Sequence, residues 1–134
     1  MHGRGEVTQM ANDEKSTFES LAAIFQVRDL PEALAFYTEM LEFEVGWTWG
    51  EPATYASVCR DRVEFNFGAP QEGQAITPSS VYIGISNIDA YHERICDRGV
   101  EVAVPIGDRD YGMRDFTITD PSGNRLSFGQ PTTG

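Results

Sequence analysis

The sequence predicts an α+β fold made of two tandem βαβββ units. Short apolar or alternating runs, typical of strands, are interrupted by only two segments with helical spacing. The order strand, helix and three strands occurs twice. Residues 29–33 correspond to 87–91 at an offset of 58, and residues 41–45 correspond to 98–102 at an offset of 57. The 134 residues are the length of one ordinary domain.

The domain is expected to span residues 21–134, with the units at about 21–70 and 80–130. Residues 1–20 are polar and small and show no sustained periodicity. We predict that they form a flexible arm with a short helix around residues 14–21.

The first unit begins with a short apolar strand, Leu21–Val27. Asp29 then predicts a helix N-cap, because Pro31 falls in the first turn and Glu32 follows three residues after the cap. The apolar stripe of this helix is Leu30, Leu34, Tyr37 and Leu41. The three remaining strands are predicted at Glu42–Trp49, Thr54–Arg60 and Val63–Phe67. In the first of these, alternation places four side chains on one side: Phe43, Val45, Trp47 and Trp49.

A segment rich in Gly, Pro, Gln and Ser, residues 68–79, predicts the linker between the units. The second unit then has an alternating strand at 81–85 and a helix that Gly99 ends. The apolar stripe of this helix is Ile88, Tyr91 and Ile95. Strands are predicted at Val100–Val104, Asp115–Thr119 and Arg125–Gly129, with a loop at Pro105–Gly112. The last two strands are joined by a turn, Asp120-Pro121-Ser122-Gly123-Asn124, in which Pro presets φ and Gly accepts a positive φ.

The formal charge is −11, from 10 Lys and Arg against 21 Asp and Glu. This balance argues against nucleic acid as a partner, because phosphate contacts need a basic face. It agrees with either a solubilising surface or a cationic partner. No apolar run is long enough for a membrane helix, and the first residues lack an apolar signal core. We therefore expect a cytoplasmic protein whose two cysteines, Cys59 and Cys96, are buried free thiols.

Two sequence segments resemble those of a known family. The first is Val27-Arg28-Asp29-Leu30 followed by Phe36-Tyr37, and the second runs from Tyr111-Gly112-Met113-Arg114-Asp115-Phe116 to Asp120-Pro121-Ser122-Gly123-Asn124-Arg125-Leu126-Ser127-Phe128. Together with the duplicated unit, they resemble the vicinal oxygen chelate superfamily, which includes glyoxalase I, extradiol dioxygenases and bleomycin resistance proteins. The second segment is most similar to that of the bleomycin resistance branch. The resemblance implies a curled mixed sheet around a cavity, helices on the outer face, and a homodimer.

Strand alternation then divides the side chains between the helix layer and the cavity. Val63, Phe65 and Phe67 are expected on the helix side, which leaves Glu64 and Asn66 in the cavity. The same reasoning places three further sets in the cavity: Ala22, Ile24 and Gln26; Ser80, Tyr82 and Gly84; and Ser127.

The resemblance also implies where metal ligands would stand. The family's four ligand positions fall on Ala22, Glu64, Ser80 and Ser127, of which only Glu64 coordinates metals well. The only two histidines are His2, in the expected arm, and His92, on the second helix and away from the cavity. We therefore predict no metal site and no cofactor. Glu64 is the only candidate catalytic residue, as a general base, and a solvated cavity carboxylate is the alternative reading.

Aromatic side chains are expected to border the cavity and the dimer groove: Trp47, Trp49, Tyr55, Tyr82, Tyr111 and Phe116. Flat aromatic faces bind planar molecules and cations, although the two tryptophans are equally suited to a core or interface position. Tyr111 stands where bleomycin resistance proteins carry a ligand-stacking Trp. Arg114 is suited to an acidic ligand group or to pairing with Asp115 or Glu64. The predicted ligand-binding residues are therefore Trp47, Trp49, Tyr55, Glu64, Asn66, Tyr82, Tyr111 and Arg114.

Three functional hypotheses follow. The first is a metal-free protein that sequesters a small cationic or aromatic molecule, such as an antibiotic, in a homodimer groove. The second is an enzyme, namely a lyase, isomerase or dioxygenase with an atypical metal site built on Glu64. The third is a dimeric accessory module. Membership of a superfamily with many chemistries supports the fold and leaves the activity open.

Overall fold

The computed structural model describes residues 15–132 and contains two four-stranded sheets. The first unit contains β1 (Ala23–Gln26), α2 (Leu30–Ala35), the π-helical turn η1 (Phe36–Met40), β2 (Glu44–Trp49), β3 (Tyr55–Arg60) and β4 (Val63–Gly68). The second contains β5 (Ser80–Gly84), α3 (Ile88–Asp97), β6 (Val102–Asp108), β7 (Met113–Thr119) and β8 (Arg125–Pro131). The duplicated βαβββ order is confirmed.

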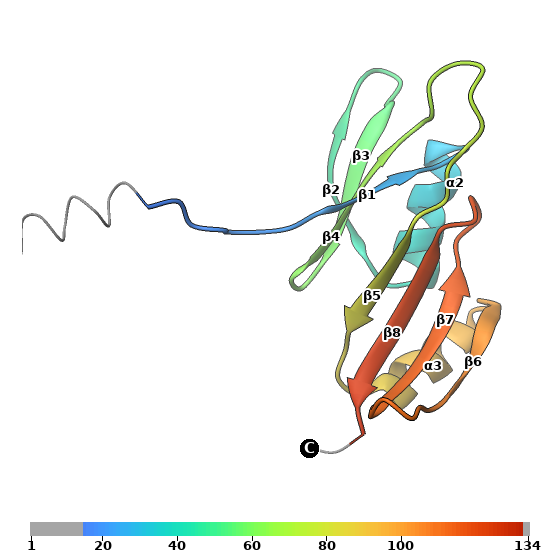
Figure 1. Cartoon of the computed structure of the whole chain (residues 1–134). Helices are drawn as coiled ribbons and strands as arrows, with labels where there is room; N and C mark the ends of the chain where they lie inside the picture. Colours follow the sequence, from blue (N-terminus) through green and yellow to red (C-terminus); the bar gives the residue numbers. More distant parts are fainter. Residues whose placement is uncertain (1–14, 133–134) are drawn as a thin grey trace, which may run out of the picture.

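The two sheets have the same topology. Their strand orders are β1-β4-β3-β2 and β5-β8-β7-β6, and in each the first strand pairs with the last in parallel. The units lie one above the other in Figure 1, with α2 packed on β3 and β4 and α3 packed on β8. The α+β class is therefore confirmed, and the mixed sheet is divided between the two units into two four-stranded sheets that are not closed.

One apolar core runs through both units on the helix side of the sheets. Phe25, Phe65 and Phe67 of the first sheet face it, as do Leu126 and Phe128 of the second, and each of the five is at most 2% exposed. This is the division of faces that alternation predicts for β1, β4 and β8. The opposite faces are consequently left uncovered in the single chain.

The first helix begins as the sequence predicts, because Asp29 accepts a hydrogen bond from the Glu32 main-chain N–H at 2.9 Å. The helix changes to a π-helical turn at Phe36 before Leu41 is reached. The second helix begins after Asn87, whose backbone is left-handed, and ends at Asp97. Gly99 follows the C-cap Arg98 and has a φ of +96°, which agrees with its predicted role as the stop signal.

Two predicted elements differ in the structure. Residues 15–22 form no helix and extend away from the body (Figure 1), so the short helix expected at 14–21 is wrong over its described part. The rest of the expected arm lies outside the described residues. The predicted loop 105–112 begins later, because β6 continues to Asp108. Pro105 is tolerated there because β6 is an edge strand with an irregular register.

No helix within residues 15–132 combines the length and hydropathy that crossing a bilayer requires. The two cysteines are free, as expected, but each is half-buried, whereas full burial is the expectation from the sequence.

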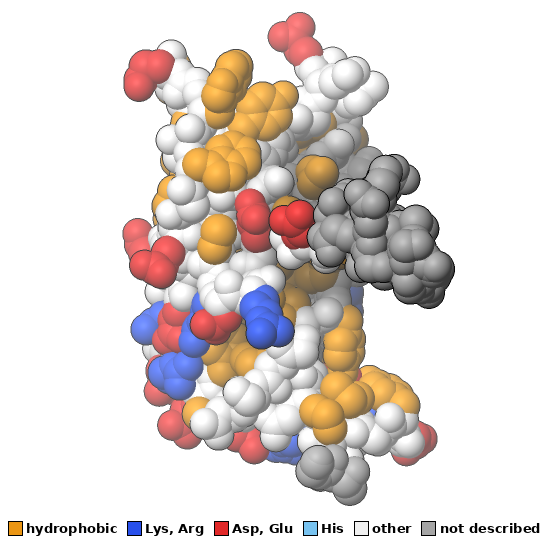
Figure 2. All heavy atoms as spheres, turned by 90° about the vertical axis from the view of Figure 1, so that its left-hand side faces the viewer, with side chains coloured by type: hydrophobic (Ala, Val, Ile, Leu, Met, Phe, Trp, Pro, Cys, Tyr) orange, Lys and Arg blue, Asp and Glu red, His pale blue; other side chains and the backbone are white. Residues whose placement is uncertain are grey.

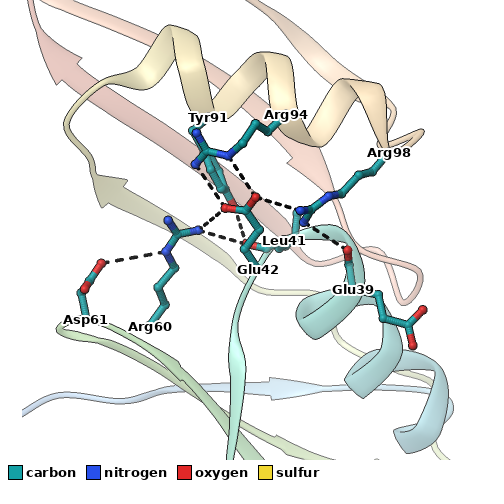
Figure 3. Close-up of polar contacts among 8 residues, drawn as sticks. All are labelled: Glu39, Leu41, Glu42, Arg60, Asp61, Tyr91, Arg94 and Arg98. Atoms are coloured by element: carbon teal, nitrogen blue, oxygen red, sulfur yellow. Dashed lines mark hydrogen bonds and ion pairs between the residues drawn. The ribbon is translucent and has the colours of Figure 1, made fainter.

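An ion-pair cluster connects the two units (Figure 3). The Glu42 carboxylate accepts hydrogen bonds from Arg60 at 2.8 Å and from Arg94 at 3.0 Å, and Arg98 lies 3.1 Å from it. Glu42 and Arg60 belong to the first unit, whereas Arg94 and Arg98 lie on or at the end of α3. Glu42 adopts a left-handed φ of 69°, which is uncommon for a residue with a side chain. Its carboxylate therefore holds α3 against the first unit.

Replacing Glu42 by glutamine is expected to lower the free energy of unfolding at pH 7 by about 1–2 kcal/mol, since all three pairs are partly exposed. Hydrogen bonding from Arg94, with smaller contributions from Arg60 and Arg98, holds the pKa of Glu42 below its ordinary value. The stabilisation is therefore complete above the unfolded pKa and is lost as the pH falls through the lowered folded pKa.

Urea unfolding between pH 7 and pH 3 tests this expectation. The difference between the wild type and Glu42→Gln should shrink as the solution is acidified. Glu32→Gln, which removes a single exposed pair with Arg28, is the matched control and should have a much smaller effect. A difference in unfolding free energy between the wild type and Glu42→Gln that stays the same from pH 7 to pH 3 would contradict the stabilising role of the Glu42 carboxylate.

Candidate functional site

The uncovered face of the first sheet carries an aromatic cluster. Trp47 pairs with Ser57 and Trp49 pairs with Tyr55, so their side chains share the face opposite the core. The Trp49 and Tyr55 rings lie 5.9 Å apart, and together with Trp47 and Thr48 they line a shallow groove. Figure 2 looks onto this side of the molecule and shows apolar side chains gathered on it, with acidic side chains nearby.

A β-bulge at Gly46 places the two tryptophans on this face. Val45 pairs with core-facing Val58, and Trp47 then pairs with the next residue, Ser57, so the register shifts by one residue. The extra residue is Gly46, at which a Cβ would collide with the Ser57 hydroxyl. The prediction that Phe43, Val45, Trp47 and Trp49 share one side is therefore wrong, because Phe43 is buried in the core.

Polar groups lie beside the aromatic cluster. Glu64 and Asn66 are half-buried on the uncovered face, as alternation predicts, with Ile24 opposite Asn66 on the adjacent β1. Glu44 on β2 and Glu64 on β4 are both register partners of Cys59, which lies on β3 between them. Glu44 thus adds a second carboxylate to this face, one that is not among the predicted site residues. The Ser57 hydroxyl and the Asn66 side-chain oxygen are buried without a hydrogen-bond partner among the described residues.

The uncovered face of the second sheet is organised around the buried carboxylate of Asp115. One of its oxygens accepts hydrogen bonds from the Tyr82 hydroxyl at 2.8 Å and from the Tyr111 hydroxyl at 2.6 Å. The other accepts a hydrogen bond from Arg109 Nε at 2.7 Å. A second Arg109 nitrogen donates to the Asp115 main-chain carbonyl at 3.0 Å. Two predicted ligand-binding residues, Tyr82 and Tyr111, are thus held by a residue that was not predicted.

Glycines give these side chains access to Asp115. Gly129 and Gly107 are the register partners of Asp115 on the two neighbouring strands. A Cβ at Gly129 would overlap the Tyr82 ring, and one at Gly107 would lie 3.3 Å from Arg109. Tyr82 therefore reaches Asp115 across Gly129, and Arg109 reaches it across Gly107. The relation of the two glycines to Asp115 depends on strand register, so it is visible in the folded sheet and not in the sequence.

The charges at this site are fixed by the same contacts. Burial raises the pKa of Asp115, but hydrogen bonds from Arg109, Tyr111 and Tyr82 outweigh burial and lower the pKa overall. Burial and the Asp115 charge raise the pKa of Tyr82 to about 12. Hydrogen bonding to Asp115 likewise raises the pKa of Tyr111. At neutral pH the carboxylate is therefore ionised and both phenols are protonated.

Groups from both units meet at a cleft of about 330 Å³ between β1, β4 and β5. Glu64 of the first sheet and Tyr82 of the second both line it, and Leu21 and Ala23 contribute apolar surface. The structure thus brings these two predicted site residues together, while Trp47, Trp49 and Tyr55 form a separate cluster on β2 and β3.

Three residues lie elsewhere. Arg114 faces the helix side, where it forms ion pairs with Asp89 at 2.9 Å and Asp108 at 3.1 Å, and it pairs with neither Asp115 nor Glu64. Phe116 is fully buried in the core, which corrects its placement at the cavity border. His92 is half-buried on α3 with its ring 4.9 Å from that of Phe116, on the helix side as predicted.

The residues at the four positions implied for metal ligands do not fit a metal ion. Ala22 has no ligating atom, and the Ser127 hydroxyl is hydrogen-bonded to Thr117 at 2.6 Å. Within residues 15–132, no three His, Cys, Asp or Glu side chains are grouped closely enough to hold one. In this part of the chain, Glu64 therefore belongs to no cluster of ligands suited to a metal ion.

Comparison with known proteins gives one family match. The model of the Glyoxalase/Bleomycin resistance protein/Dioxygenase superfamily matches residues 20–128. The uncharacterized protein Rv0887c of Mycobacterium tuberculosis is 31% identical over 55 residues, which are 41% of this chain and 32% of that protein. A Mycobacterium bovis protein, Mb0911c, matches to the same extent, over 36% of its length. The matched stretch thus spans about a third of these relatives.

Solved structures share the fold at low sequence identity. TioX from Micromonospora sp. ML1 has a TM-score of 0.77 at 15% identity, covering 85% of this chain and 99% of that one. TnmS3, an antibiotic binding protein from Streptomyces sp. CB03234, has a TM-score of 0.74 at 20% identity, covering 88% and 99%. A lactoylglutathione lyase from Agrobacterium tumefaciens has a TM-score of 0.72 at 18% identity, covering 87% and 96%.

Proposed function

The chain belongs to the glyoxalase/bleomycin resistance protein/dioxygenase superfamily, and within this family we propose that it binds and sequesters a small aromatic cation, without a metal ion and without turnover. The observation that carries this proposal is the aromatic character of the uncovered sheet faces. Five aromatic residues on these faces, Trp47, Trp49, Tyr55, Tyr82 and Tyr111, are between 45% and 67% exposed. Large aromatic side chains so placed are suited to stacking on a planar ligand.

The electrostatic surroundings favour a cation. Glu44 and Glu64 stand on the same face as the tryptophans, in a chain whose formal charge is −11. Aromatic faces attract cations, and an acidic field raises their local concentration. The antibiotic binding protein TnmS3 has a similar fold, which supports an antibiotic as one class of ligand.

A homodimer is part of this proposal. Both sheets are open, and the exposed apolar side chains on their uncovered faces include Ile24 at 75% exposure. A second copy would cover these faces and enclose a ligand between them. Sedimentation equilibrium should give twice the chain mass of 14.9 kDa. A monomer at micromolar concentration would rule out a groove between protomers.

Intrinsic fluorescence tests the binding directly, because Trp47 and Trp49 are the only two tryptophans in the chain. Bleomycin and 9-aminoacridinium should quench it saturably, whereas the planar anion anthracene-9-carboxylate should bind far more weakly. Trp49→Ala should weaken binding about 5- to 30-fold, measured by titration calorimetry, because a cation–π contact contributes about 1–2 kcal/mol.

Phe18→Ala is the matched control, since Phe18 is also a large exposed aromatic residue but lies outside both sheets. It should leave the affinity unchanged. Failure of every planar cation to bind would refute the proposed function. The alternative, an enzyme using Glu64, requires stoichiometric metal and an activity that Glu64→Gln abolishes; elemental analysis and assays after loading with Ni, Zn, Mn or Fe distinguish the two.

A further inference from the structure

The Asp115 network fixes the direction of hydrogen bonding on the second sheet. An ionised carboxylate only accepts hydrogen bonds, so the Tyr82 and Tyr111 hydroxyls must both donate to it. Each hydroxyl has a single proton, and that proton is used within the network. What remains on each phenol oxygen is its capacity to accept.

Exposure determines which groups a ligand meets. Tyr82 and Tyr111 are 50% and 67% exposed, whereas Asp115 is 5% exposed beneath them. Arg109 occupies the second carboxylate oxygen, and its guanidinium also bonds main-chain carbonyls of Pro105 and Asp115. A ligand on this face therefore contacts two phenol rings whose oxygens accept hydrogen bonds, and it does not reach the carboxylate itself.

We propose that Asp115 is a positioning residue that makes this half of the site select ligands carrying N–H donors, such as protonated amines and amidinium-like ring systems. This inference rests on the proposed function and specifies its ligand class. A cation that offers only C–H groups would gain the stacking interaction but would leave the phenol oxygens without a hydrogen bond. Such a loss lowers affinity by about tenfold for one hydrogen bond.

Two planar cations of similar shape test this selection. The 9-aminoacridinium ion carries N–H donors, whereas the 10-methylacridinium ion carries none. Titration calorimetry of the full chain should show that 9-aminoacridinium binds about tenfold more tightly or better. The double substitution Tyr82→Phe/Tyr111→Phe keeps both rings and removes both acceptors, so it should reduce this ratio to near one.

Two further variants distinguish the positioning role of Asp115 from an effect of the shape of the site. Ser20→Ala removes an exposed hydroxyl that lies outside the Asp115 network and outside both sheets, and it should leave the ratio unchanged. In Asp115→Asn the amide oxygen must face Arg109, which can only donate, so the amide NH2 group faces the oxygen position that both tyrosines use. The tyrosine oxygens then accept from this NH2 group and their protons become free, so the ratio should fall although both tyrosines remain. Melting temperatures measured in parallel report whether each variant is folded.

The outcomes are distinct. Equal binding of both cations by the wild type, or a preference that survives the double substitution, would overturn this inference and leave the proposed function standing. If neither cation binds, both the inference and the proposed function are overturned.

Discussion

Replacing Asp120 by alanine is expected to lower the free energy of unfolding by about 3–5 kcal/mol, because four donors lose one buried acceptor group. The Asp120 carboxylate accepts hydrogen bonds from the buried Tyr37 hydroxyl and from the Ser122 main-chain N–H, each at 2.9 Å. It also accepts hydrogen bonds from the main chain of Asn124 at 2.9 Å and from its side chain at 3.0 Å.

The turn formed by residues 120–124 connects segments that are far apart in the sequence. The Asn124 amide donates to the Gln26 carbonyl at 3.0 Å and accepts from the Ser79 main chain at 2.8 Å, so it joins the first unit, the linker and β8. Loss of Asp120 therefore affects both units, and a cooperative loss of stability is expected.

Urea denaturation of Asp120→Ala measures the effect. Asp120→Asn keeps one acceptor oxygen and should lose less stability, which provides a folded comparison if the alanine variant fails to fold. Asp110→Ala, at an exposed position of the 109–112 turn, is the control and should change the stability little. A loss below about 1 kcal/mol for Asp120→Ala would contradict the role of this turn.

Gly129→Ala is expected to lower the free energy of unfolding by about 1–3 kcal/mol through overpacking. The added methyl group would overlap the Tyr82 ring, so the ring must move off the sheet and lose its hydrogen bond to Asp115. The pKa of Tyr82 should then fall from about 12 toward its ordinary value. Thermal melting and NMR titration of labelled tyrosine rings measure the two effects.

The matched control is Gly84→Ala. Gly84 is the register partner of Gly129 on β5, and a Cβ there meets no atom within 4 Å. Its stability should be close to that of the wild type, and its Tyr82 pKa should be unchanged. Equal effects of the two substitutions would mean that Tyr82 does not depend on the space above Gly129.

Much of the fold could be predicted from local patterns. Alternation assigned the faces of β1, β4, β5 and β8 because each pairs in regular register with its neighbours. The Asp29 cap and the 120–124 turn were recognisable because their residue types satisfy particular backbone groups.

The tryptophan face could not be assigned by the same reasoning. Trp47 and Trp49 continue the alternation begun by Phe43 and Val45, and a bulge does not interrupt that pattern in the sequence. What changes the face is the pairing of β2 with β3, a non-local property. Gly46 is the only local sign of it.

The Asp115 network was missed for a related reason. Its members come from β5, β7 and the 109–112 turn, and no spacing along the chain connects them. From the sequence, Arg114 is expected to meet an acidic ligand group or to pair with Asp115 or Glu64, but neighbours in a strand point to opposite faces, so Arg114 does not reach Asp115. Asp89 and Asp108 therefore bind it on the helix side.

The two halves of the chain share one topology and differ in what their open faces offer. The open face of the first unit presents indole rings and carboxylates. The open face of the second presents phenol oxygens that can only accept a hydrogen bond from a ligand, above the ion pair between Arg109 and Asp115. The repeated topology thus carries two open faces of unlike chemistry. Under the proposed function, a ligand bound between two such unlike faces would have a preferred orientation, so its binding would be directional although the two units share one topology.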